Sequence, residues 1–409
     1  MKKKFIKTLI IIVLFIIYAY TLAISNVPNN IVIFEGETIN LNSIFGLKIN
    51  INNSDTIQVL ATESNKIDTA VKTTAKVSLF DNILIKNIDV DVLPKTKVIP
   101  IGSMAGLKLY TNGVLVVGMA EIQGEDSKKY KPCENTGIKE GDTLIEINSN
   151  KIESTGDLIQ KVNNSNGDNI NLKYIHRNET KECSITPVKT SNNQYKLGLW
   201  VRDSAAGVGT VTFYDPKTKS FGALGHGITD IDTEKLINIE SGEFVSTRVL
   251  NIVKGENGIP GKIQGSIEDG KNIGTISKNT KFGIYGQVNN VSNLNIDTSK
   301  EMEVALREEI KTGKATILCS LGNNNVESYE IEIEKIYKNN NYDNKSMQIK
   351  VIDPKLIEKT GGIIQGMSGS PIIQNGKFVG AVTHVLVNSP DTGYAVFADM
   401  MIKQMREVK

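Results

Sequence analysis

The chain contains few of the residues that build metal sites or disulfide frameworks. Its 409 residues include only 3 cysteines and 3 histidines. Cys133, Cys183 and Cys319 are odd in number and widely spaced, with no Cys-x-x-Cys pair and no His-Glu-x-x-His sequence. Structural zinc sites need such closely spaced ligands, so we expect no metal and no other cofactor. Free or semi-buried thiols are the favoured interpretation, and a Cys133–Cys183 disulfide is the alternative in an exported chain.

The chain also lacks an excess of charge of either sign. It has 47 basic and 45 acidic residues, a formal net charge of +2. This balance gives no electrostatic basis for binding nucleic acid. With 40% hydrophobic and 22% charged residues the composition is that of a globular protein, and the length predicts two or three domains.

One long apolar run is present, at the N-terminus. Residues 2–4 and 7 are lysines, and the uncharged run from Thr8 to Ile24 follows them. Its length is close to the ~17–25 residues that span a bilayer, and the lysines should stay on the cytoplasmic side. We therefore expect residues 1–25 to be a signal anchor, or a signal peptide cut near residues 23–25. In both cases the rest of the chain is exported from the cytosol.

Short runs rich in Val, Ile and Thr, separated by turns, predict a mainly β fold. Residues 26–100 show such runs without any recognisable motif and are expected to form a small β-rich region. The expected strands are residues 31–34, 57–60, 76–79 and 90–93.

A distinct signature lies between Asn135 and Asn148. Gly137 and Gly141 suit tight-turn positions, and Asp142 can accept hydrogen bonds from nearby amides before an apolar strand begins. Ser154 is the expected N-cap of the next helix. This stretch resembles the PDZ signature, and we assign residues 101–189 to a PDZ domain.

A PDZ domain adds an extended peptide to a sheet edge and captures its terminal carboxylate on loop amides. By resemblance to the bacterial form, the loop is residues 111–114 and the edge strand is residues 115–117. The expected peptide-binding residues are Gly113, Val114, Leu115 and Val116. A PDZ-shaped spacer that binds nothing is the alternative.

Residues 195–409 have the size and strand-rich pattern of two packed β-barrels, as in chymotrypsin-like proteases. The segment Gly366-Met367-Ser368-Gly369-Ser370-Pro371 presents a serine in a glycine-flanked turn, as a nucleophile requires. Ser368 is the expected nucleophile, and the N–H groups of Gly366 and Ser368 are the expected oxyanion donors. Ser370 is the competitor, but a residue before proline favours an extended conformation.

His226 is the expected general base, because small residues around it, Gly225-His226-Gly227, permit close approach of another strand. His384, on the strand that returns from the serine turn, is the alternative. His176 lies in the PDZ region and is expected at the surface, at a strand end.

Chemistry alone offers several carboxylates that could orient the histidine. Asp230 and Asp232 are close to His226 in sequence but could cap a helix, and Asp269 lies in a glycine-rich turn. Asp353 ends an apolar strand before Pro354, which suits either a rigid catalytic acid or a simple turn.

Several motifs together resemble the stage IV sporulation protein B (SpoIVB) peptidase family. They are residues 222–227, residues 352–372 and residues 379–385, in a chain that orders membrane segment, PDZ domain and protease domain. The resemblance covers the chain from the PDZ domain onward. It implies the catalytic residues His226, Asp353 and Ser368.

The resemblance further implies a sporulation signalling protease exported across the forespore membrane into the intermembrane space. Family members cleave themselves in trans and cleave a membrane-bound regulator of an intramembrane protease, which leads to activation of a late mother-cell sigma factor. An alternative from another class is a membrane-tethered PDZ scaffold with an inactive protease-like domain. A quality-control protease of the HtrA type would place the protease domain before the PDZ domain, the reverse of the order here.

Overall fold

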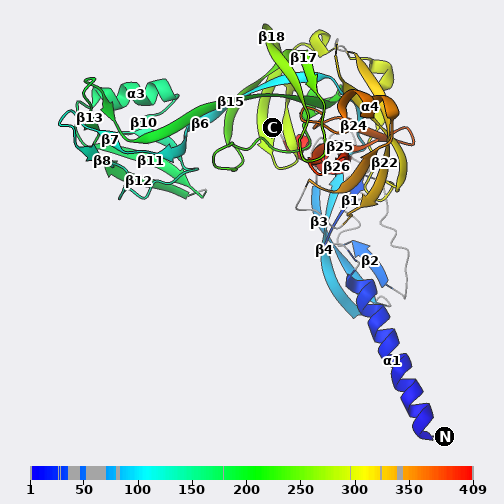
Figure 1. Cartoon of the computed structure of the whole chain (residues 1–409). Helices are drawn as coiled ribbons and strands as arrows, with labels where there is room; N and C mark the ends of the chain where they lie inside the picture. Colours follow the sequence, from blue (N-terminus) through cyan, green and yellow to red (C-terminus); the bar gives the residue numbers. More distant parts are fainter. Residues whose placement is uncertain are drawn as a thin grey trace.

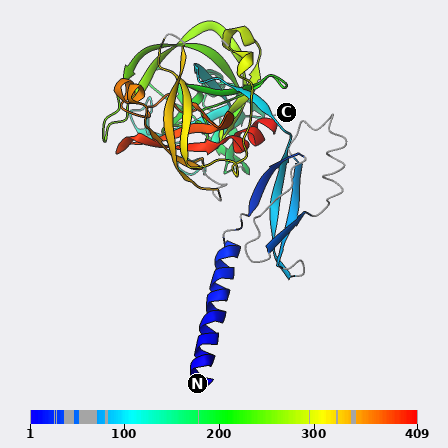
Figure 2. The same cartoon turned by 90° about the vertical axis from the view of Figure 1, so that its right-hand side faces the viewer.

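The computed structural model describes residues 2–25, 27, 29–35, 47–51, 71–79, 83–177, 179–294, 296–322, 325–338 and 344–407. Two β-barrels form the main body, and a small module projects from one side of it (Figure 1). A separate sheet and a long helix extend from the body toward the N-terminus (Figure 2). The mainly β fold predicted from the sequence is confirmed.

Helix α1 (Lys2–Ser25) covers the apolar run and leads away from the body. Most of its described apolar side chains are exposed, with Phe15 at 69%. No helix in the described ranges meets the combined length and apolarity expected of a membrane-crossing segment. The membrane segment therefore stays a prediction.

The N-terminal region forms a four-stranded sheet in the order β1-β4-β3-β2. Its strands are β1 (Asn30–Phe34), β2 (Leu47–Ile51), β3 (Val71–Leu79) and β4 (Ile83–Leu93). The expected strand at residues 57–60 lies outside the described residues. Lys403 of the C-terminal helix binds Asp91 of β4 at 2.5 Å, which ties this sheet to the main body.

The first barrel closes as the ring β6-β17-β18-β19-β16-β15, because β15 also pairs with β6. Phe221, Phe244 and Leu109 are fully buried in its core. The ring strands are β6 (Met104–Met119), β15 (Leu199–Asp215), β16 (Ser220–Ala223), β17 (Ile239–Val253), β18 (Lys262–Thr280) and β19 (Gly283–Val288). Strands β5 (Lys97–Pro100) and β20 (Met302–Glu303) extend the sheet beyond β15. Short 3-10 helices follow at Val291–Leu294 and Thr298–Lys300.

The second barrel is closed in the order β21-β22-β23-β26-β25-β24. Its strands are β21 (Gly313–Ser320), β22 (Val326–Ile336), β23 (Met347–Val351), β24 (Pro371–Gln374), β25 (Lys377–Leu386) and β26 (Ser389–Phe397). Two helices belong to this half: α4 (Pro354–Thr360) follows β23, and α5 (Ala398–Arg406) ends the described chain. Both barrels were expected within residues 195–409, but the first one also contains β6, which lies outside that range.

The projecting module, which we call the side module, comprises residues 112–203. It holds β7 (Ile122–Gln123), β8 (Lys129–Tyr130), β9 (Thr143–Ile147), β10 (Asn150–Lys151), α3 (Thr155–Asn164), β11 (Ile170–His176), β12 (Glu179–Ile185), β13 (Val188–Lys189) and β14 (Tyr195–Lys196). As predicted, Ser154 caps α3 by accepting from the N–H of Asp157, and Asp142 accepts from the N–H of Lys139. His176 was expected at the surface, but its Nδ1 lies 2.8 Å from the buried Asp142 carboxylate.

Strands β6 and β15 run from the first barrel into the side module as a paired ribbon (Figure 1). Residues 104–111 of β6 pair with barrel strands, whereas Val114 and Leu115 pair with β9. The sequence assigns β6 to one domain and β15 to the next, but in the structure each strand belongs to both. The physical reason is that the barrel closes only when β6 pairs with β15.

Candidate functional site

The serine turn lies between α4 and β24, and backbone hydrogen bonds hold it in place. The N–H of Ser370 donates to the carbonyl of Met367, and the N–H of Gly369 donates to Val382 on β25. Gly369 has φ +96°, and a Cβ placed on it would lie 2.2 Å from the carbonyl oxygen of Thr210. Only glycine fits this turn, because both its backbone angle and its contact with the first barrel exclude a side chain.

The Ser368 hydroxyl sits at the apex of this turn, where it donates to the carbonyl of Thr383 at 2.8 Å. No described hydrogen bond uses the N–H of Gly366 or of Ser368, so these amides remain available to an oxyanion. The competitor Ser370 is fully buried. The geometry thus favours Ser368 over Ser370 as the residue that reaches a substrate.

His226 follows β16 in a loop of the first barrel. Leu224, two residues before His226, has φ +69°, a strained conformation for a residue with a bulky side chain. Asn279 on β18 holds the loop through three hydrogen bonds. Its Oδ1 accepts from the N–H of Ile228, and its Nδ2 donates to the carbonyls of Ile228 and Ile237.

The orientation of the His226 ring sets its chemistry. Nδ1 lies 2.9 Å from the carbonyl oxygen of Gly227, which can only accept a hydrogen bond. Nδ1 must therefore carry the proton, and Nε2 keeps its lone pair. Burial lowers the pKa of His226, with a smaller opposing effect from the Gly227 carbonyl. The ring is thus held as a neutral imidazole in the tautomer that a general base needs.

The histidine loop and the serine turn meet at β25. The rings of His226 and His384 lie 5.3 Å apart between centroids. His384 directly follows Thr383, whose carbonyl binds the Ser368 hydroxyl. A Cβ on Gly225 would lie 3.0 Å from Thr383 Cγ2. The structure therefore brings Ser368, His226 and His384 into one region between the two barrels.

The carboxylate of Asp353 is engaged at the start of helix α4. Its Oδ1 accepts from the N–H groups of Lys355 and Leu356 and caps α4, and its Oδ2 lies 3.2 Å from the N–H of Glu330. Pro354 at the first helical position and Gly361 at the C-cap complete this short helix. No described contact joins Asp353 to His226, so its catalytic role stays a prediction.

The other candidate acids do not bond to His226 among the described contacts. Asp230 is buried, and its Oδ1 accepts from the N–H groups of Asp232 and Thr233. These bonds stabilise a turn, and no helix begins there. The side chain of Asp269 lies outside the described ones.

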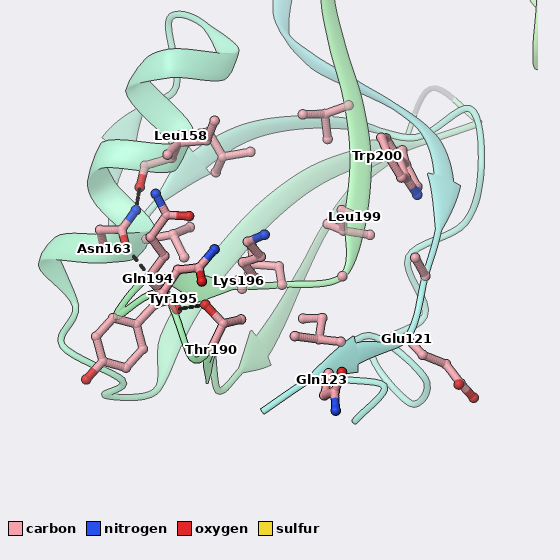
Figure 3. A pocket seen from close by; sticks show the side chains of 18 of the residues that line it. Glu121, Gln123, Leu158, Asn163, Thr190, Gln194, Tyr195, Lys196, Leu199 and Trp200 are labelled. Carbon is pink, nitrogen blue, oxygen red and sulfur yellow. Dashed lines mark hydrogen bonds between the residues drawn. The ribbon is translucent and has the colours of Figure 1, made fainter. Parts of the chain in front are cut away.

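A groove of about 700 Å³ opens in the side module between α3 and the first residues of β15. Figure 3 shows Leu158 of α3 and Trp200 of β15 on opposite sides of it. Within the described chain, Leu199–Val201 pair with β6 alone, so their other edge faces the groove unpaired. Such an edge beside a helix can accept an extended peptide as an added strand.

A tight turn precedes this edge at Leu197-Gly198. Gly198 has φ +71°, and its carbonyl accepts from the N–H of Ala120. Burial raises the pKa of the Cys133 thiol to about 12, with a smaller contribution from the nearby Cys183. The protonated thiol therefore donates to the carbonyl of Leu197 at 3.1 Å. No described hydrogen bond uses the N–H groups of Leu197 and Gly198, which are suited to bind a carboxylate.

The groove differs from its expected place at Gly113, Val114, Leu115 and Val116. Val114 and Leu115 pair with β9, and Leu115 and Val116 also pair with β15, so this stretch has no free edge. Val114 and Val116 are fully buried. The signal that could have located the groove is the Leu197-Gly198-Leu199 turn before a strand, which in the sequence falls at the start of the expected protease domain.

Two barrels that bring a serine, a neutral imidazole and unused backbone amides together define a serine peptidase. The SpoIVB peptidase S55 family model matches residues 193–402, more than half of the chain, and the chain belongs to that family. A PDZ domain model matches residues 107–186, which confirms the PDZ assignment of the side module. The groove wall at residues 197–201 lies just beyond that match.

Solved structures show weaker likenesses. The PDZ domain of the SdrC-like protein (Lmo2051) from Listeria monocytogenes is 20% identical, covers 22% of this chain and 87% of its own, and has a TM-score of 0.18. The active form of the Rv3671c protease from M. tuberculosis is 14% identical, covers 50% of this chain and 74% of its own, and has a TM-score of 0.29. Likenesses this low carry no argument about function.

Proposed function

We propose that this serine peptidase is an endopeptidase in which Ser368 attacks the scissile carbonyl and His226 removes its proton. The N–H groups of Gly366 and Ser368 bind the oxyanion. The supporting observation is that the serine turn and the histidine loop, from different barrels, meet at Thr383 and His384. In the reaction the Ser368 hydroxyl turns from the Thr383 carbonyl toward Nε2 of His226.

Asp353 enters the proposal through the family resemblance as the residue that orients His226 and stabilises its charged form. Its carboxylate is engaged at the start of α4, so this role requires the segment to rearrange. The Gly227 carbonyl already selects the tautomer of His226. The remaining contribution of Asp353 would be electrostatic, through its negative charge.

The family resemblance also supports a physiological role in sporulation signalling. We propose that the protein is exported across the forespore membrane with α1 as its initial anchor. There it cleaves itself in trans, and it cleaves a membrane-bound regulator of an intramembrane protease to trigger sigma-factor activation. The lysines and apolar run at the N-terminus support the export step.

The groove of the side module is proposed to bind peptide C-termini or extended segments of these protein partners. An apolar wall of Leu158, Val162 and Leu199 suits an apolar terminal side chain. The free edge of β15 supplies backbone hydrogen bonds, and the Leu197-Gly198 turn supplies amides for the carboxylate.

A phosphonofluoridate probe tests the catalytic assignment, because it reacts preferentially with an activated serine. We expect labelling of the full chain, loss of labelling in Ser368→Ala, and retention in Ser370→Ala. Self-cleavage, detected by N-terminal sequencing, should follow the same pattern: present in the full chain, lost in Ser368→Ala and retained in Ser370→Ala. Labelling that survives in Ser368→Ala would refute the assignment. A chain that folds but never labels would instead favour the membrane-tethered scaffold with an inactive protease-like domain.

A further inference from the structure

Strand β15 connects the groove to the catalytic region. Leu199–Val201 at its start form one wall of the groove. Near its other end, the N–H of Thr210 donates to the carbonyl of Ser368, and the Thr210 hydroxyl donates to the carbonyl of Gly366. The same strand therefore lines the groove of the side module and supports the serine turn.

Arg202, the residue after the groove wall, reaches the loop that contains His226. Its guanidinium pairs with Asp230 and, at 2.7 Å, with Asp232. Asp230 is fully buried, and its Oδ1 already accepts from the N–H groups of Asp232 and Thr233. Its Oδ2 is the atom that Arg202 contacts. The pair thus fixes a buried carboxylate four residues after His226 to the strand that borders the groove.

The opposite wall of the groove, helix α3, is hydrogen-bonded to Asp203, the residue after Arg202. The carboxylate of Asp203 accepts from the N–H of Thr155 at the start of α3, at 2.8 Å. The carbonyl of Asp203 accepts from the hydroxyl of Thr111 on β6. A ligand between α3 and β15 therefore contacts two elements, and both of them are connected to residues 202 and 203.

We propose that Arg202 is a positioning residue through which a peptide bound in the groove raises turnover at Ser368. The occupant is an extended peptide with a free terminal carboxylate and an apolar last side chain, which matches the unpaired strand edge, the turn amides and the apolar wall. The proposal rests on the proposed peptidase function. In the structure the Ser368 hydroxyl donates to Thr383, so proton transfer to His226 needs a different arrangement. A peptide that pairs with the free edge of residues 199–201 favours that arrangement through the Arg202 link, which raises its population.

The chain offers its own reporter of groove binding. Trp200 is the single tryptophan, and it lines the groove. The probes are short peptides with a free C-terminal leucine, isoleucine or valine, and the same peptides with an amidated end. We expect the free acids to change Trp200 emission in the full chain and to raise the maximal rate of phosphonofluoridate labelling about fivefold or more. The amides should do neither.

Arg202→Gln separates coupling from binding. We expect the same change in Trp200 emission, no acceleration by peptide, and an unchanged probe concentration for half-maximal rate. The matched control Arg248→Gln, an exposed arginine of the first barrel, should respond like the unaltered chain. Arg202→Lys keeps the charge but not the two-pronged contact, and should give a reduced acceleration, which keeps the test valid if the Gln variant does not fold.

Each other outcome overturns the proposal. Full acceleration in Arg202→Gln or Arg202→Lys removes Arg202 from the pathway. If peptides bind to the unaltered chain but do not accelerate labelling, the groove and Ser368 are not coupled. If no peptide changes Trp200 emission, the groove does not bind such peptides, and the proposed coupling fails with it. The peptidase assignment fails separately, by the loss of Ser368-dependent labelling in the absence of peptide.

Discussion

The serine turn and the histidine loop are built in different ways. The serine turn is held mainly by backbone hydrogen bonds, such as Gly369 to Val382, together with one side-chain bond from the hydroxyl of Thr210. The histidine loop is held by side chains from distant strands, Asn279 on β18 and Arg202 on β15. The nucleophile is therefore positioned mainly by backbone groups, whereas the position of the base depends mainly on side-chain contacts, which a single substitution can remove.

The largest expected effect distinguishes the two histidines in this region. We expect His226→Ala to lower the rate of phosphonofluoridate labelling by about 10⁴-fold or more, because the general base is lost. His384→Ala should lower it less than about tenfold, since removal of a neighbouring ring leaves the base in place. Labelling kinetics on both variants measure this difference. If His384→Ala lowers the rate more than His226→Ala does, His384 is the base, and the histidine loop does not carry it.

Asp353 provides the next test, because two substitutions separate its possible roles. Asparagine is as good an N-cap as aspartate, so Asp353→Asn should keep α4 while it removes the charge. We expect labelling to fall by about 10²-fold with the melting temperature nearly unchanged, because only the charge that stabilises the protonated ring is lost. Asp353→Ala should additionally cost about 1 kcal/mol of stability from the lost cap. If Asp353→Asn keeps full activity, the residue only caps the helix.

Asn279→Ala tests whether the histidine loop depends on remote side chains. It removes three hydrogen bonds and leaves the backbone groups of Ile228 and Ile237 without them. We expect a loss of about 1–3 kcal/mol in the free energy of unfolding, and slower labelling at saturating probe. Denaturant unfolding and labelling kinetics measure the two effects. Unchanged values in both experiments would show that Asn279 does not hold the loop.

The pH dependence gives the smallest effect. Burial lowers the pKa of His226, so the base stays neutral below the ordinary imidazole value of about 6.5. The acidic limb of the labelling rate should have its midpoint below that value. The unfolded chain binds the proton more readily, so His226 should also destabilise the fold as pH falls through about 6.5. Rates from about pH 5 to pH 8 measure the limb, and a midpoint above 6.5 contradicts it.

The sequence predicted the serine turn well, because its glycines and proline determine the backbone locally. The helix cap at Ser154 and the PDZ signature were predictable because they depend on residues close together in the chain, whereas the strand-rich pattern predicted two barrels without showing that β6 closes the first one. Helix α4 was missed, since it is short and Asp353-Pro354 also reads as a turn that ends a strand.

The groove of the side module was not located from the sequence, because strand pairing is not visible there. Residues 113–116 look like an edge strand until β15 returns from far along the chain and pairs with them. The expected domain boundary near residue 195 separates residues 197–201 from α3, so the sequence does not show that both line one groove. The contact of Arg202 with Asp230 joins strands of different modules, and no local pattern could indicate it.

A structure of the full chain after phosphonofluoridate labelling tests the pairing of Ser368 with His226 most directly. We expect phosphorus on Ser368 Oγ, its oxygen within hydrogen-bond distance of the N–H groups of Gly366 and Ser368, and Nε2 of His226 facing the adduct. An adduct on another residue, or one faced by His384 while His226 points away, would contradict the assignment.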